Sequence, residues 1–65
     1  MPEVVVFAIE GRSLEQKRAL VKDITDAVVK HFAVDPAAVI VSLMETPKAN
    51  KSKGGVLFSE MPPKR

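Results

Sequence analysis

The sequence predicts an α/β protein made of one β-α-β unit followed by a short C-terminal hairpin. Three observations predict this class: an apolar run over residues 4–9, an amphipathic stretch over residues 14–32 and a second apolar run over residues 39–44. Strands that flank a helix in one sheet lie parallel and are joined by a right-handed crossover. The 65 residues are enough for one domain, so we expect a single domain over 1–65.

The first strand is expected over residues 4–9, which read VVVFAI and end at Glu10-Gly11. β-branched and aromatic residues of this kind favour strands. The run shows no alternation of apolar and polar residues, so we expect both faces of the strand to be covered.

The helix is expected over Leu14–Phe32. Ser13 is the predicted N-cap, and Gln16 stands three residues later, at the spacing of a capping box. Apolar residues then recur at helical spacing, with charged residues mostly between them. Asp35-Pro36 is expected to end this segment, because the residue before a proline avoids helical backbone angles.

The second strand is expected over residues 39–44, which read VIVSLM. A polar stretch over 46–53 follows, and Gly54-Gly55 then introduces an apolar hairpin arm over 56–58. We expect the tail over about 60–65 to be loosely held.

One β-α-β unit is not a finished domain, because its sheet has two open edges and one uncovered face. The chain is 46% hydrophobic and has no cysteine, so no disulfide can compensate for a small core. We therefore expect an oligomer in which two copies complete one sheet.

Composition argues against several classes of function. The net charge is only +2 and there is no Trp or Tyr, which does not favour nucleic-acid binding. No apolar run approaches the roughly 18 residues of a membrane span, and acidic Glu3 with no basic segment does not suit a signal peptide. We expect a cytoplasmic protein with no membrane partner. No phosphate loop or metal motif is visible, so no cofactor or metal is expected.

Pro2 is the first candidate for chemistry. Removal of Met1 would give the chain a secondary amine at its start. An α-amino group has a pKa near 8, and an apolar pocket beside a cation would lower it, leaving a neutral general base. From its position alone, a proline without any function is the simpler interpretation.

Other titratable residues are less informative. Arg12 follows Gly11 at the strand-to-helix turn, at the opposite end of the first strand from Pro2. The two can therefore meet only between chains, and Arg12 can also be a solvated turn residue. His31 is expected to be a helix-end residue. Glu10 and Glu45 can be paired carboxylates, but isolated Glu residues at strand ends are usually solvated, and we expect this of both.

The whole pattern resembles the 4-oxalocrotonate tautomerase family. The resemblance is carried by Met-Pro at the start, the stretch EGRSLEQK over residues 10–17, the strand that ends at Glu45, and Gly54-Gly55. It implies a hexamer, a trimer of dimers in which each dimer shares a four-stranded sheet. It also implies a tautomerase in which Pro2 moves a proton in a small carboxylate-bearing enol or 2-oxo acid. Arg12 would bind a carboxylate or polarise the adjacent carbonyl.

Two departures from the family pattern bear on substrate choice. Ile40 stands where relatives that handle a dicarboxylate carry a second arginine, and Lys51 stands where they carry an aromatic residue. We therefore expect a weakened preference for dicarboxylates, unless Lys51 or one of its neighbours Lys48 and Lys53 supplies the cation. Lys51 is accordingly a candidate substrate-binding residue, although lysine does not grip a carboxylate in bidentate fashion.

Two alternatives stay open. The chain can be a catalytically weak structural subunit of a hetero-hexamer, like the non-catalytic chain of some dehalogenases in the superfamily. It can also be a basic binding module that uses the lysines of the 48–53 loop, although a solvated loop explains those lysines more simply.

Overall fold

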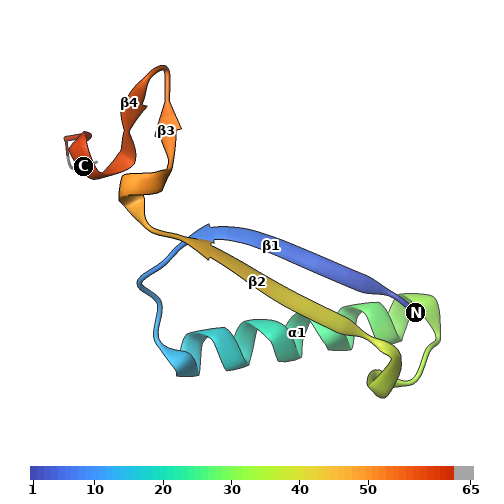
Figure 1. Ribbon diagram of the computed structural model, residues 1–65. Coiled ribbons are helices and arrows are strands. Elements are labelled where there is room, and N and C mark those ends of the chain that lie inside the picture. Colours follow the sequence, from blue (N-terminus) through green and yellow to red (C-terminus); the bar gives the residue numbers. More distant parts are fainter. Residues whose placement is uncertain (63–65) are drawn as a thin grey trace.

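The computed structural model describes residues 1–62 and consists of a β-α-β unit from which a small hairpin projects (Figure 1). The unit contains β1 (Glu3–Ile9), α1 (Leu14–Phe32) and β2 (Ile40–Thr46), and the hairpin contains β3 (Ser52–Lys53) and β4 (Val56–Leu57). Single 3₁₀ turns cover Pro36–Ala38, Lys48–Asn50 and Phe58–Glu60. The predicted fold class is confirmed. The second strand lies slightly later than predicted, over 40–46 rather than 39–44.

Strands β1 and β2 are parallel and paired over their full length, from Glu3 opposite Ile40 to Ile9 opposite Thr46. One further bond extends the pairing at each end. The Ile40 N–H donates to the Pro2 carbonyl at 3.0 Å, and the Glu10 N–H donates to the Thr46 carbonyl at 3.1 Å. Residue 2 and residue 10 therefore mark opposite ends of the same strand pair.

The ends of α1 are set by local hydrogen bonds. The Gln16 N–H donates to Ser13 Oγ at 3.1 Å, and the Ser13 N–H donates to Gln16 Oε1 at 2.9 Å, which confirms the capping box. The helix ends at Phe32, three residues before Asp35, because Ala33 adopts a left-handed conformation (φ 56°) and its N–H bonds the Val29 carbonyl. Asp35 does not end α1; its side chain accepts a hydrogen bond from the Ala37 N–H and caps the 3₁₀ turn over Pro36–Ala38.

Replacing Ala33 with Gly is expected to raise the free energy of unfolding by about 0.5–1 kcal/mol. A left-handed residue with a Cβ is strained, and glycine removes that strain at a helix end. Ala19→Gly, an exposed site inside α1, is the matched control and should lower stability by about 1 kcal/mol. Thermal and urea unfolding measure both variants, and destabilisation by Ala33→Gly would contradict the assigned helix end.

The helix covers only one face of the two-stranded sheet (Figure 1). On β1, Val4, Val6 and Ala8 are half-buried, whereas Val5 and Phe7 on the other face are 47% and 74% exposed. Met44, opposite Phe7 on β2, is 51% exposed. The expectation that both faces are covered is therefore wrong for a single chain over residues 1–62, in which α1 covers one face and no other helix or strand covers the second.

An ion pair ties the helix to the sheet. Lys17 Nζ lies 2.5 Å from Glu45 Oε1, and the two side chains are 32% and 24% exposed. Glu45 is opposite Ala8 on the face that α1 covers. The carboxylate of β2 is thus used to dock the N-terminal part of α1 and is not simply solvated.

The hairpin turns at Gly54 and Gly55, whose φ angles are 60° and 83°. Two consecutive positive φ angles are what a type I′ hairpin turn requires, and glycine adopts them without strain. The predicted loose tail over about 60–65 falls partly on residues 63–65, which lie outside the described residues. Within the described part of the chain, no helix has the length and apolar character to cross a membrane.

Candidate active site

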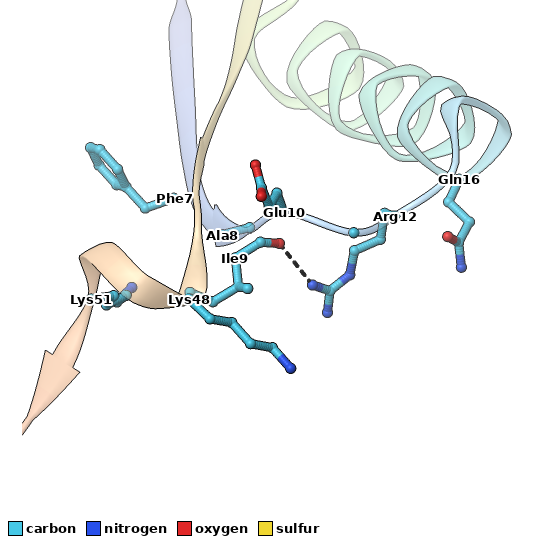
Figure 2. A pocket seen from close by; sticks show the side chains of 9 residues that line it. Phe7, Ala8, Ile9, Glu10, Arg12, Gln16, Lys48 and Lys51 are labelled. Atoms are coloured by element: carbon cyan, nitrogen blue, oxygen red, sulfur yellow. Dashed lines mark hydrogen bonds between the residues drawn. The ribbon is translucent and has the colours of Figure 1, made fainter. Parts of the chain in front are cut away.

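A broad open hollow of about 760 Å³ lies where β1 runs into the turn before α1 (Figure 2). Its walls come from three segments: the end of β1 and the following turn, the first turn of α1, and the 3₁₀ turn after β2. It is lined by Phe7, Ala8, Ile9, Glu10, Gly11, Arg12, Gln16, Lys48 and Lys51. Three of these side chains are basic and one is acidic, so the hollow suits an anion.

Arg12 is positioned by the turn between β1 and α1. Gly11 has a φ of 130°, which a residue with a side chain rarely adopts, and Ser13 begins the helix cap directly after Arg12. Arg12 Nη1 donates to the Ile9 carbonyl at 3.1 Å, and Figure 2 shows the rest of the guanidinium extending outward from this bond. Most of the guanidinium donors therefore stay available for a carboxylate, which arginine binds through two parallel bonds.

The lysines of the hollow come from the segment after β2. Pro47 precedes a 3₁₀ turn over Lys48–Asn50, so Lys48 is the first residue of this turn and Lys51 directly follows it. Lys51 Nζ is 5.9 Å from the centre of the Phe58 ring, within the range of a cation–π contact. The structure thus places Lys51 in the same hollow as Arg12, and it also brings in Lys48.

Pro2 lies outside this hollow. The seven residues of β1 separate it from the turn that carries Arg12, a span of about 23 Å at about 3.3 Å per residue. Figure 1 shows the N-terminus at the far end of β1 from that turn. Pro2 is half-buried, and its neighbour across the sheet is Ile40, which is 39% exposed. One chain therefore brings Arg12 and Lys51 together and leaves Pro2 and Ile40 at the other end.

A second, smaller cavity of about 330 Å³ lies behind Arg12, between α1 and the sheet. Its wall is mainly apolar, and the Lys17–Glu45 ion pair also lines it. This pair was not predicted. A signal was present in the sequence, because Glu45 comes two residues after Leu43 and so shares the sheet face that packs on α1.

His31 lies in the last turn of α1 and is exposed, as expected of a helix-end residue. Glu10 lines the hollow, but Figure 2 shows its carboxylate pointing away from the Arg12 guanidinium. No ion pair joins Glu10 to another side chain of residues 1–62. Neither residue forms a catalytic pair in the described structure.

Comparison with known proteins identifies the class. The family model described as "Tautomerase enzyme" matches residues 2–61. A probable tautomerase from Bradyrhizobium diazoefficiens is 47% identical over 60 residues, which cover 92% of this chain and 90% of that protein. A 2-hydroxymuconate tautomerase from Comamonas testosteroni is 36% identical over 61 residues, covering 94% and 97%.

Structural comparison gives the same result. The solved structure of a heterohexamer 4-oxalocrotonate tautomerase from Chloroflexus aurantiacus superposes with a TM-score of 0.84 at 31% identity, covering 95% of this chain and all of that one. The fold and these relatives define a small isomerase. More narrowly, the chain belongs to the tautomerase family and is of the 4-oxalocrotonate tautomerase type.

Proposed function

We propose that the protein interconverts enol and keto forms of 2-hydroxy-dienoates or related 2-oxo acids, with the Pro2 amine as general base once Met1 has been removed. The observation that carries the proposal is the placement of Arg12 in an anion-suited hollow, within a tautomerase-family chain that begins with Met-Pro. A neutral secondary amine freed at residue 2 supplies the general base that the reaction needs.

The reaction needs only proton transfers. The neutral Pro2 nitrogen takes the proton of the enol hydroxyl, the C–O bond becomes a carbonyl, and the ammonium returns a proton to a carbon of the conjugated system. No oxidant or co-reactant is required. Arg12 holds the substrate carboxylate or polarises the neighbouring carbonyl, which stabilises the negative charge that builds on oxygen in the transition state.

The complete site requires two chains, because Pro2 and Arg12 lie at opposite ends of β1. Surface area supports such an assembly. The chain exposes 5401 Å², whereas a compact protein of its mass exposes about 4,100 Å². Its radius of gyration is 15.3 Å, against about 11 Å expected for a compact domain of this length. No side chain among residues 1–62 is fully buried, so the core has to form between chains.

We expect the protein to be a homohexamer in solution. The uncovered sheet face, with Val5, Phe7 and Met44, is the surface that needs a partner. Native mass spectrometry and analytical ultracentrifugation at micromolar concentration should give six times the chain mass. A folded monomer at this concentration would remove the basis for a site shared between chains.

A second candidate is a catalytically weak subunit of a hetero-hexamer. The similarity to a heterohexamer from Chloroflexus aurantiacus favours it, together with the unusual residues Ile40 and Lys51. The same mass measurement separates the two: a stable assembly of this chain alone favours the homohexameric enzyme, whereas failure to assemble without a second chain favours the subunit.

The direct test of function is an enol-to-ketone assay on protein whose N-terminal residue has been verified as Pro2. Ultraviolet absorbance follows 2-hydroxymuconate, 2-hydroxypenta-2,4-dienoate and phenylenolpyruvate. Acceleration of at least one substrate over buffer is expected. An assembled, Met1-free protein that accelerates none of them would contradict the proposed activity.

A further inference from the structure

We infer that Lys48 binds substrate as a second cation beside Arg12, and that it determines how strongly the site favours a doubly charged substrate over a singly charged one. The inference rests on the proposed tautomerase function and assigns a specificity-determining residue to its site.

Backbone pairing brings Lys48 and Arg12 to the same place. The last bond between β1 and β2 joins the Glu10 N–H to the Thr46 carbonyl at 3.1 Å. Arg12 lies two residues after one partner of this bond, and Lys48 lies two residues after the other. Pro47, with its fixed φ of −62°, turns the chain at once into the 3₁₀ turn that starts at Lys48. Both residues are therefore held close to the end of the strand pair.

The Lys48 amine is available for a ligand. The ion pairs among residues 1–62 are Lys17–Glu45 and Lys22–Asp26, and no hydrogen bond within that range uses the Lys48 side chain. Figure 2 shows Lys48 and Arg12 reaching out on the same side of the hollow, with the Glu10 carboxylate directed the other way.

The other two lysines of the loop are less suited to the role. Lys51 also lines the hollow, but its amine stands over the Phe58 ring at 5.9 Å. Lys53 is on β3, opposite Val56 and outside the lining of the hollow. Lys48 is thus the loop cation that combines a place in the hollow with a free amine in the described structure.

Two neighbouring cations favour a dianion. A carboxylate that leaves water needs a charged or hydrogen-bonding partner. Arg12 alone offers one guanidinium, which binds one carboxylate through two parallel hydrogen bonds and leaves a second carboxylate without a partner. Ile40, at the Pro2 end of the strands, contributes no charge. Lys48 therefore supplies, at the Arg12 end of the strands, the second positive charge that Ile40 does not supply at the Pro2 end. Because lysine is a flexible point charge, it attracts the second carboxylate without fixing its orientation.

Equilibrium binding tests this inference independently of turnover. Calorimetry at low salt compares two unreactive six-carbon dienoates: trans,trans-muconate with two carboxylates and sorbate with one. The wild type is expected to bind muconate more tightly. Lys48→Met should lower the muconate-to-sorbate affinity ratio about tenfold, the usual size of one charge-assisted bond. Lys53→Met is the matched control and should leave the ratio unchanged.

Kinetics provide the second readout, as the ratio of kcat/KM for 2-hydroxymuconate over 2-hydroxypenta-2,4-dienoate in the same three proteins. The same tenfold fall is expected in Lys48→Met, in an assembly whose native mass is unchanged. Equal ratios in wild type and Lys48→Met would overturn the role of Lys48 even if both are active. Muconate binding that depends on Lys48 in an inactive wild type would uphold Lys48 as a binding residue and reject the tautomerase proposal.

Discussion

A protein in which the Pro2 nitrogen stays in a peptide bond is expected to lose nearly all tautomerase activity. A Gly-Ser extension placed before Pro2 removes the basic amine and leaves every side chain of the hollow in place. General base catalysis by a positioned group contributes about 10²–10⁴-fold, so kcat/KM should fall by at least about 100-fold. Steady-state kinetics on the extended and the Met1-free proteins give the comparison.

The pH profile separates loss of the base from loss of structure. Only the neutral amine accepts a proton, so the Met1-free protein should lose activity as the pH falls through the pKa of Pro2. The residual rate of the extended protein should lack this dependence. Native mass spectrometry confirms that both proteins assemble alike, and an extended protein with full activity and the same mass would exclude Pro2 as the base.

Replacing Arg12 with Ala is expected to reduce kcat/KM by about 10- to 100-fold, with little change in the melting temperature. A charge-assisted bond to a carboxylate contributes about 1.5–3 kcal/mol, whereas the structural role of Arg12 is one exposed bond to the Ile9 carbonyl. Arg12→Lys should recover part of the lost kcat/KM, because lysine keeps the positive charge but cannot bind a carboxylate through two parallel hydrogen bonds.

Arg18→Ala is the matched control for this experiment, since Arg18 is exposed on α1 and does not line the hollow. It should leave both activity and melting temperature close to those of wild type. If Arg12→Ala lowers the melting temperature as strongly as it lowers activity, Arg12 is a structural residue.

The local elements were predictable because their signals lie within a few residues of one another. Ser13 and Gln16 form the capping box at the predicted start of α1, and Gly54-Gly55 makes the predicted hairpin turn. The predicted end of α1 at Phe32 is also confirmed, but the residue that stops the helix was not predictable. Ala33 takes a left-handed conformation that alanine does not favour, two residues before the local stop expected at Asp35-Pro36.

Contacts between distant segments were only partly predictable. The Lys17–Glu45 ion pair joins residues 28 positions apart. The spacing from Leu43 puts Glu45 on the sheet face that packs on α1, but nothing local selects Lys17 as its partner. The place of Lys48 in the hollow likewise depends on the register of β1 against β2, which no short motif encodes.

The sequence by itself determined the β-α-β unit, the helix start and the separation of Pro2 from Arg12, because each follows from local patterns and from the length of one strand. Only the tertiary structure decided which sheet face α1 covers and which cations surround Arg12. Both depend on strand register, since a shift of one residue turns every side chain of a strand to the other face. The register observed leaves Phe7 and Met44 uncovered and brings Lys48 to the end of β1 that carries Arg12.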